Sequence, residues 1–378
     1  GWQGGTLKLS DCPTCRSLDT INPGLKNAVA GVSPDTGFAA TSIDFRPPES
    51  WQWNVTVSRE VLKDTVVEAS YIGNKGSHIW RRGVPYNPTV QSARLQIAQA
   101  QRTNPDNVNA LVNANKVYKG LGPITASEST GDSSYNSLQV WVNRRFSDRL
   151  AFQASYTWSH AISNVPLTSF QTATTDPFNY DLDRGEADLD RRQMLVGNAV
   201  YVLPSFKKQG AFVSNILGDW QINGIVSLLD GTPIDVTSGA DTAGLGGAGT
   251  QRPDLVPGQP IYVKSSNKLK YLNPAAFALP GVGKFGSLGR GAIVGPGIAN
   301  VDFSLNKNWR VRERFGVQFR AEMFNLFNRA NLTGADGGLS LQNVSSNAGF
   351  GKPGNTNFGN LGRSRGPREI QFGLKLTF

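Results

Sequence analysis

Apolar and polar residues alternate with a period of two along much of this 378-residue chain. Phe152, Tyr156 and Trp158, for example, lie in a segment whose odd positions from 153 to 159 are all polar. Such alternation is typical of a β-strand with one apolar and one polar face. The pattern is less regular in 191–203, and Trp141 interrupts the polar face of its segment. Nine strands are predicted, at residues 51–58, 67–71, 138–143, 152–159, 191–203, 220–228, 301–309, 315–323 and 370–378.

The connections between these strands alternate between short and long. Residues 59–64, 147–149 and 310–314 form tight connections, and 204–218 is intermediate. Outer-membrane barrels combine short periplasmic turns with long extracellular loops. If Phe378 ends on the periplasmic side, every tight turn falls on that side too. The long polar stretches, of about 60, 30, 70 and 40 residues, begin at Asn74, Ala161, Asp230 and Asn328.

The sequence therefore predicts an all-β fold: about nine strands of a larger antiparallel transmembrane β-barrel. Most of the strands approach the length of about 9–11 residues that spans a bilayer when tilted. No run of about 18 apolar residues is present, which excludes a transmembrane helix. Forty-two glycines and 21 prolines suit many turns and long loops. Only residues 91–118 offer a short helix, within a loop.

Aromatic residues lie near the ends of the predicted strands, on their apolar faces. Outer-membrane barrels carry girdles of amphipathic rings at both membrane interfaces. Two interpretations are open, because Trp is also common in strands generally. We favour a girdle over this general preference. The aromatic residues concerned are Trp51, Trp53, Tyr156, Trp158, Trp220 and Trp309.

The net charge of +10 points to an anionic partner or simply to a basic surface. Nucleic acid is a poor candidate, because no Lys/Arg cluster recurs with interleaved aromatic residues. Anionic lipid headgroups or lipopolysaccharide of the outer membrane are better candidates.

No set of residues indicates an enzyme, a cofactor or a metal. His78, in a loop, and His160, at a strand end, have no partner that the sequence identifies. The glycine-rich stretch 244–249 lacks the Lys and Ser/Thr of a phosphate-binding loop, so we expect a flexible loop. The dense charged run 181–192 could hold Ca²⁺ in principle, but its spacing does not match an EF-hand. A solvated loop with internal ion pairs is favoured there, and Arg320 and Glu322 are expected to face the lumen.

The two cysteines form a Cys12-Pro-Thr-Cys15 motif. A possible disulfide in an oxidising compartment is favoured over free thiols, since no second ligand pair for zinc is present. The chain begins at Gly1 without a Met, a charged stretch or an apolar signal segment, so the true N-terminus is expected to be missing.

The last residues, 371–378, read QFGLKLTF. They resemble the assembly signal of outer-membrane proteins. In that signal a polar residue is followed two positions later by a Gly, the third-last residue is apolar, and the last residue is aromatic. The resemblance implies recognition of the last strand by the barrel-assembly machinery. The matching positions are Gln371, Gly373, Leu376 and Phe378.

Further segments resemble TonB-dependent receptors of the Oar-like type, which carry a carboxypeptidase-regulatory-like N-terminal domain. The resemblance covers roughly residues 50–378 and implies a large barrel of about 22 strands with a plugged lumen. It also implies ligand uptake across the outer membrane of a Gram-negative bacterium, driven by the TonB complex acting on the plug. The matching stretches are ASYIGNKGSH at 69–78, YNSLQ at 135–139, SYTWSH at 155–160, GDWQING at 218–224, FRAEMFNLFN at 319–328 and FGNLG at 358–362.

The chain departs from this family because no plug or TonB-box region is visible, and bacterial single-chain barrels have an even number of strands. Residues 1–49 are therefore predicted to be an extracellular loop region and 50–378 the C-terminal part of the barrel. The strand at 51–58 would then lack a neighbour on one side. The loop residues match no ligand-specific pattern, so the ligand stays unknown at this point.

Two other functions stay open at this point. One is a secreted β-rich module that binds carbohydrate through its Trp and Tyr residues. The other is an outer-membrane adhesin that does not transport. Apolar faces on nearly every strand argue against the soluble module, because they would expose a large apolar patch.

Overall fold

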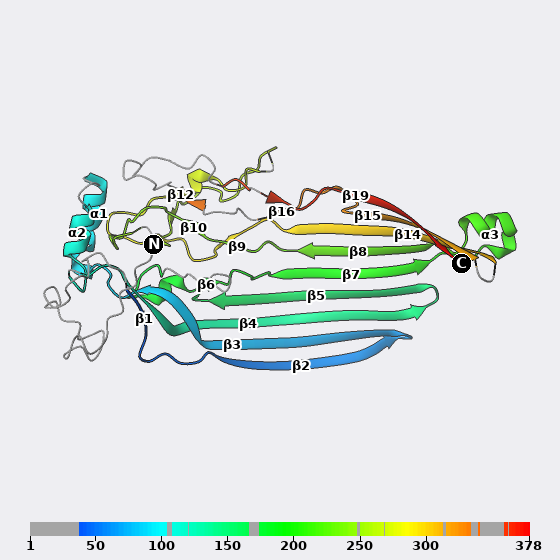
Figure 1. Ribbon diagram of the computed structural model, residues 1–378, viewed down its shortest axis with the longest axis horizontal. Coiled ribbons are helices and arrows are strands. Elements are labelled where there is room, and N and C mark those ends of the chain that lie inside the picture. The colour runs from blue at the N-terminus through cyan, green and yellow to red at the C-terminus, as the bar shows by residue number, and fades with distance from the viewer. Residues whose placement is uncertain are drawn as a thin grey trace.

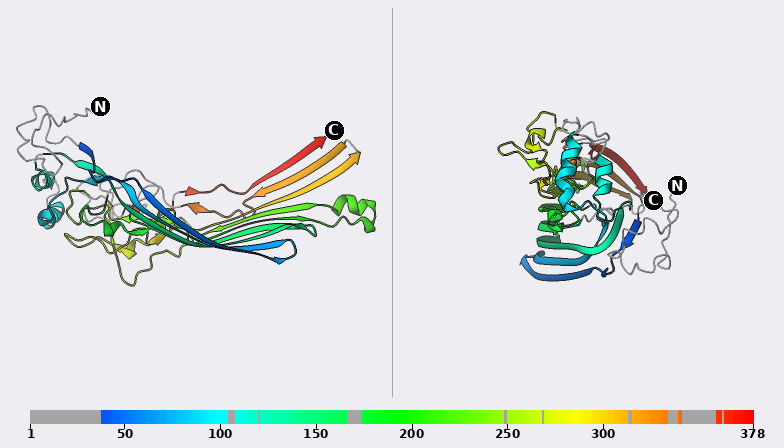
Figure 2. Two further views of the ribbon diagram at one scale, coloured as in Figure 1. Left: turned by 90° about the horizontal axis from the view of Figure 1, so that it is seen from below. Right: turned by 90° about the vertical axis from the view of Figure 1, so that its left-hand side faces the viewer.

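The chain forms one long, curved β-sheet with irregular segments gathered at one end (Figures 1 and 2). We describe it from a computed structural model. The structure describes residues 38–103, 108–119, 121–165, 174–247, 250–267, 269–312, 315–333, 339–340, 359–361 and 363–378.

Strands are the main regular structure of the described residues, and the helices are short. The α-helices are α1 (Arg94–Thr103), α2 (Val108–Ala114) and α3 (Ala211–Leu217). The long strands are β2 (Glu49–Leu62), β3 (Thr65–Pro85), β4 (Ile124–Ser147), β5 (Leu150–Ser163), β7 (Gln193–Val202), β8 (Gln221–Leu229), β14 (Ile298–Arg312), β15 (Phe315–Phe324) and β19 (Glu369–Thr377). The short strands are β1 (Phe38–Thr41), β6 (Gly185–Glu186), β9 (Pro233–Ile234), β10 (Val236–Thr237), β11 (Asp254–Leu255), β12 (Phe277–Ala278), β13 (Ile293–Val294), β16 (Leu332–Thr333), β17 (Leu339–Ser340) and β18 (Arg363–Ser364).

The nine long strands are those that the sequence predicts, and each lies beside its neighbours in the sequence. Their order is β19-β15-β14-β8-β7-β5-β4-β3-β2. Every neighbouring pair is antiparallel, as in Tyr71↔Leu138 and Leu138↔Trp158. An antiparallel sheet can present one apolar and one polar face, which explains why the alternation located the strands so well.

Two strands continue well beyond their predicted bounds. β3 runs to Pro85 and β4 begins at Ile124. The connection between them is therefore shorter than the predicted loop of about 60 residues from Asn74. Register shifts between Gly76 and Val84 keep the two strands paired as far as Pro85↔Thr125. Alternation fails in these extensions because neither face needs to be uniformly apolar. Part of the region 1–49 is also a strand, since β1 pairs in parallel with β4 through Phe38↔Ile124.

One face of the sheet is apolar from edge to edge. Directly opposed residues of antiparallel strands lie on the same face, and the row Val140, Tyr156, Leu195, Leu228 and Ala299 crosses five strands. Many of the side chains on this face are open to the surroundings; Trp158, for example, is 59% exposed. The opposite face carries polar rows such as Asn306, Arg320 and Gly373. Arg320 and Glu322 therefore lie on the polar face, as predicted.

The sheet is curved but not closed among the described residues. Of the long strands, β2 pairs only with β3 and β19 only with β15, so each leaves one edge without a partner. This agrees with the expectation for the strand at 51–58. Figure 2 shows the two edges apart, with β19 and β2 on different sides of the curved sheet.

The two ends of the sheet differ in kind. At one end, which we name the turn end, tight connections join β2 to β3 and β4 to β5, and α3 lies between β7 and β8. The other, which we name the loop end, carries α1, α2 and most of the short strands (Figure 1). The predicted helix within 91–118 is in fact two helices, and α3 was not predicted. No described helix is long and apolar enough to span a membrane.

Candidate functional site at the loop end

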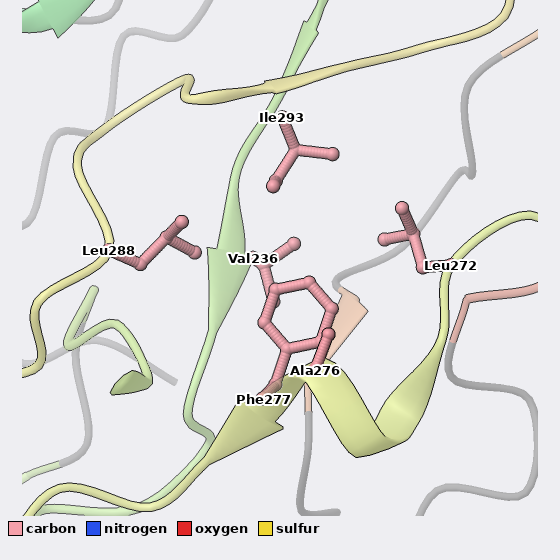
Figure 3. Close-up of a cluster of buried hydrophobic side chains, with 6 residues drawn as sticks. All are labelled: Val236, Leu272, Ala276, Phe277, Leu288 and Ile293. Atoms are coloured by element: carbon pink, nitrogen blue, oxygen red, sulfur yellow. The ribbon is translucent and has the colours of Figure 1, made fainter. Parts of the chain in front are cut away.

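Three segments make up most of the described loop end: residues 86–123 after β3, 164–192 after β5 and 230–297 after β8. We name these the loop-end segments. The segment 230–297 has a small hydrophobic core of its own, in which Val236, Leu272, Phe277 and Ile293 are nearly inaccessible to solvent (Figure 3). Such a core orders a long connection that would otherwise cost considerable chain entropy. The segment is therefore a folded unit rather than a simple loop.

The helices α1 and α2 form a second small core and dock onto the segment 230–297. Ile97 and Val112 are among the buried residues of this core. Thr89 Oγ1 donates a hydrogen bond to the Gly244 carbonyl at 2.9 Å, and Gln101 Nε2 donates to Asp241 Oδ2 at 2.8 Å. Hydrogen bonds thus hold two of the loop-end segments against each other.

Gly244 lies where these two segments approach each other closely. A Cβ atom there would meet the Arg94 carbonyl oxygen at 2.0 Å, and the residue has a φ of +76°, which favours glycine. Asp241 fixes the chain just beyond it by accepting hydrogen bonds from the backbone N–H groups of Leu245 and Gly246. The expectation of a flexible loop is therefore wrong for Gly244.

Ion pairs attach the segment 164–192 to the rest of the loop end. Arg94 makes two hydrogen bonds to Asp176, of 3.0 and 2.7 Å between guanidinium nitrogens and carboxylate oxygens. Arg290 lies 2.7 Å from Asp188 and also donates to the carbonyl oxygens of Ser163 and Asp183. Paired guanidinium–carboxylate groups of this kind combine charge with fixed geometry.

The predicted internal ion pairs of the charged run 181–192 are confirmed. Arg192 lies 2.8 Å from Glu186 and 3.1 Å from Asp190. Pairs to distant residues were not predicted, such as Asp183 with Arg81 at 3.3 Å, because sequence spacing shows only near neighbours. In the described part of the chain no group of three or more acidic, His or Cys side chains is placed to hold a metal ion.

Burial shifts the pKa values of several loop-end groups. Burial lowers the pKa of the Arg252 guanidinium, with Asp235 and Asp183 opposing the effect. Burial and the hydrogen bond to Glu128 raise the pKa of the Tyr180 hydroxyl, and burial beside Tyr262 raises the pKa of Tyr271 to about 12. These phenols stay neutral at physiological pH and act as hydrogen-bond donors. Tyr180 donates to Glu128 and Tyr271 to the Val294 carbonyl, so both hydroxyls help to hold the loop end together.

A shallow concavity of about 300 Å³ lies beside the ion-pair cluster, where β3, β4 and β5 meet the segment 164–192. Its lining comes from both the sheet and the loop end and combines apolar surface with polar and charged side chains. The residues lining it include Asn74, Ser133, Tyr135, Ser159, Asp190, Arg191 and Met194. A small ligand could contact strand and loop residues together here.

The other residues singled out in the sequence are spread over the molecule. His78 Nδ1 lies 3.8 Å from Glu49, and His160 Nε2 lies 3.0 Å from Glu186. Neither neighbourhood resembles a catalytic set. Trp220 and Trp309 meet at the turn end, with ring centroids 6.2 Å apart, whereas Trp158 lies on β5 nearer the loop end. Cys12 and Cys15 lie outside the described residues.

The four residues of the predicted assembly signal lie on or directly after β19, at the sheet edge. Gln371 is opposite Glu322, and Gly373 is opposite Arg320 on the polar face. Leu376 lies on the apolar face, and Phe378 is 97% exposed. The residues are thus accessible together along one strand.

Comparison with known proteins supports the architecture. Residues 9–371 match the family described as "Outer membrane beta barrel domain". The chain is 25% identical over 274 residues, 65% of its length, to the TonB-dependent transporter Oar of Myxococcus xanthus, and it spans 22% of that protein.

Solved outer-membrane transporters also align with most of the chain. The outer membrane transporter YddB from Escherichia coli aligns with 92% of this chain and 35% of its own, with a TM-score of 0.45 and 9% identity. The E. coli Ferric-Catecholate import receptor Fiu covers 94% of this chain and 30% of its own, with a TM-score of 0.39 and 13% identity.

The predicted resemblance to Oar-like receptors is confirmed by the relative from Myxococcus xanthus, which is a transporter. An apolar face that crosses every strand, polar rows on the other face and the match over residues 9–371 agree with one another. The chain belongs to the outer membrane beta barrel domain family, which places it in the outer membrane of a Gram-negative bacterium.

Proposed function

We propose that this chain is part of a TonB-dependent receptor that binds a ligand at the loop end and admits it along the polar face of the sheet. The single observation that carries the proposal is the joining of the loop-end segments into one body by Arg94–Asp176 and Arg290–Asp188. Ordered loops bind with a smaller entropy loss than loose ones. A receptor for a scarce ligand needs such a preformed surface.

The polar rows below the loop end suit passage of a hydrated ligand. Asn223 donates to Ser304 at 2.8 Å, and Gln318 donates to Asn308 at 2.9 Å, so these side chains already form lateral hydrogen bonds. Barrel lumens are polar for the same reason. The energy for release into the periplasm would come from the TonB complex, acting through a plug.

The orientation follows from the contrast between the two ends of the sheet. Short turns face the periplasm and long loops the exterior in outer-membrane barrels, so the turn end would face the periplasm. The loop end, with residues 86–123 and 230–297, would face lipopolysaccharide and the external ligand. On this proposal residues 1–49 belong to the loop end and 50–378 to the barrel. The edge strand β19 would then offer its last residues to the barrel-assembly machinery.

The test is a comparison of nutrient depletion by living cells. Wild-type cells, cells lacking this gene and cells lacking TonB are grown in one complex medium, and mass spectrometry follows the consumed compounds. We expect at least one compound to remain in the medium of both mutants. If every compound is consumed at the wild-type rate while attachment to surfaces fails, the protein is an adhesin and the proposal is wrong.

A loop-end variant sharpens this test. Asp176→Asn removes the charge that Arg94 pairs with, and the receptor should take up the identified compound with a several-fold higher half-saturation concentration. Arg184→Met is the matched control, because this Arg lies exposed in the same charged run. Equal amounts of both variants in the outer membrane must be verified by immunoblot. Unchanged uptake by Asp176→Asn would show that ligand binding does not depend on the Arg94–Asp176 pair of the loop end.

A further inference from the structure

The connection between β7 and β8, at the turn end, contains a short helix with an exposed apolar face. Within α3, Phe212 and Ile216 are spaced by four residues, as are Val213 and Leu217, so they share one side of the helix. Phe212 is 78% exposed, Ile216 47% and Leu217 55%. Nothing in the described residues covers these side chains. A water-exposed helix of seven residues would not keep such a face without a partner.

Side chains from the apolar face of the sheet hold α3 in place. Trp309 Nε1 donates to the Asn215 carbonyl at 2.9 Å, and Trp220 Nε1 donates to the Ile216 carbonyl at 2.7 Å. Lys307 Nζ donates to the Gly218 carbonyl. The last carbonyl groups of a helix lack partners within the helix. Trp309 and Lys307 of β14 and Trp220, directly before β8, donate to carbonyl groups at and just after the end of α3, which fixes the position of α3 relative to the sheet.

The register shows which side of the sheet α3 occupies. Lys307 is opposite Phe319, and Trp309 is opposite Val317, within the same apolar rows that contain Leu374 and Leu376. The donors that hold α3 therefore project from the membrane-facing side. The apolar surface of α3 continues the apolar face of the sheet beyond the ends of its strands.

The residues that lead into α3 are basic. Lys207 and Lys208 are exposed, and no acidic residue occurs between Leu203 and Gly218. Asp219 is the first acidic residue, directly after the helix. Basic residues next to an exposed apolar face are typical of helices that lie in a membrane interface, where lysines contact anionic lipid headgroups.

From these observations we infer that α3 is an interfacial anchor that inserts Phe212, Ile216 and Leu217 into the periplasmic leaflet of the outer membrane. Lys207 and Lys208 then bind the phosphate groups of anionic phospholipids. The occupant is a phospholipid surface because the apolar patch is continuous with the membrane-facing side of the sheet. The inference rests on the proposed orientation, in which the turn end faces the periplasm, but not on the transport of any ligand.

The anchor also explains a lysine in an apolar row. Lys307 is only 3% exposed, and its ammonium group lies 5.9 and 5.8 Å from the ring centroids of Trp220 and Trp309. Cations are attracted to the faces of such rings. With α3 above it, the charge is shielded from hydrocarbon and paired with a carbonyl group. Without α3, the same lysine would face lipid.

The depth of α3 in the membrane can be measured directly. The protein is purified from its outer membrane with Cys12 and Cys15 replaced by Ser, carries a spin label at Phe212→Cys, and is reconstituted into phosphatidylcholine vesicles with or without phosphatidylglycerol. We expect collisions with oxygen to exceed those with a water-soluble nickel complex at 212. Labels at Gln209→Cys and Lys264→Cys should show the reverse. A label at 212 that behaves like these water-exposed controls overturns the inference.

The role of the lysines has a matched control. Lys207→Gln with Lys208→Gln should move the label toward water in vesicles that contain phosphatidylglycerol and abolish the difference between the two lipid mixtures. Lys264→Gln with Lys270→Gln, at the loop end, should leave the depth unchanged. An effect of equal size from both pairs would overturn the assignment of Lys207 and Lys208 to anionic lipid.

Labelling of intact cells tests the orientation separately. A membrane-impermeant maleimide should react with Lys264→Cys but not with Phe212→Cys. Reaction at Phe212→Cys but not at Lys264→Cys would place the turn end at the cell surface and overturn the assignment to the periplasmic leaflet. Because this readout needs no substrate, it stands apart from any failure of the uptake experiment. Retention of the protein in the membrane confirms that each variant is folded.

Discussion

At the scale of single residues, the alternation of apolar and polar residues is interrupted at positions where a side chain contacts another part of the protein instead of lipid. Lys307 occupies an apolar row yet is buried under α3. Gly73 lies opposite Trp53, and a Cβ atom at Gly73 would come within 2.1 Å of the Trp53 indole, so this glycine leaves room for the ring. At such positions a specific contact, rather than the polarity of the sheet face, determines which residue is suitable.

The first prediction concerns Lys307. The variant Lys307→Met keeps the length of the side chain but leaves the Gly218 carbonyl without its donor, which costs about 1–3 kcal/mol when the group is buried. We expect faster hydrogen exchange at residues 211–218 and an unchanged sheet. Lys375→Met, on the polar face of β19, is the control. Equal exchange rates in both variants would show that Lys307 does not hold α3.

The second prediction concerns Phe378. Its side chain is 97% exposed, so Phe378→Ala removes almost no packing from the folded chain. If the residue acts as an assembly signal, the variant should reach the outer membrane in much smaller amounts while the assembled fraction keeps its thermal stability. Quantitative immunoblots of membrane fractions measure the first, and heat-dependent gel mobility the second. Normal amounts in the membrane would contradict the signal at Phe378.

At the scale of elements, the segment 230–297 is a folded unit attached through a narrow neck. Gly231 and Gly295 meet there, and a Cβ atom at Gly231 would lie 1.8 Å from the Gly295 carbonyl oxygen. The small core around Phe277 and Ile293 lies beyond this neck (Figure 3). The chain can therefore enter and leave the segment 230–297 in this way only because glycine occupies the neck. The strands on either side do not need glycine for this reason.

A third prediction tests the neck. Gly231→Ala should displace the backbone and destabilise the segment by about 1–3 kcal/mol, as overpacking does elsewhere. Gly224→Ala is the matched control, because no atom lies within 4 Å of a Cβ at that position of β8. Limited proteolysis of the membrane-embedded protein should cut only the Gly231→Ala variant faster between 230 and 297. Equal cleavage of both variants would show that the neck tolerates a methyl group.

At the scale of the whole molecule, the two open edges of the sheet have the largest consequence for stability in a bilayer. The described sheet leaves the outer side of β2 and of β19 without strand partners. Lipid offers no hydrogen bonds to backbone groups, so an unpaired edge within a membrane is costly. Exposed apolar edges such as Trp51, Val55 and Phe372 would add a tendency to associate. The edges need further strands to be stable in a bilayer.

The fourth prediction follows for the polypeptide 1–378 expressed by itself. It should aggregate or fail to insert into lipid, because no strand of the described residues pairs with the outer edge of β2 or of β19. Size-exclusion chromatography in detergent and heat-dependent gel mobility report the outcome. A monomeric, heat-modifiable and membrane-inserted species would show that the edges pair with each other, and the need for additional strands would be disproved.

Much of the fold could be predicted from the sequence, and the loop end could not. The nine long strands were found because alternation in a strand depends only on which side each residue faces, a property local to the chain. The internal ion pairs of the charged run 181–192 were likewise expected from its density of acidic and basic residues. The extensions of β3 and β4, by contrast, have no uniform face, and the short helix α3 lacks the length for a periodic signal.

The sequence by itself therefore determined the strands, their two faces and the alternation of turns and loops, because side-chain direction follows from the backbone. Only the tertiary structure decided that Arg94 and Asp176 pair, that Gly244 is a contact point and that Lys307 lies beneath α3. These outcomes depend on groups that are far apart in the chain and gain their strength when water is excluded around them.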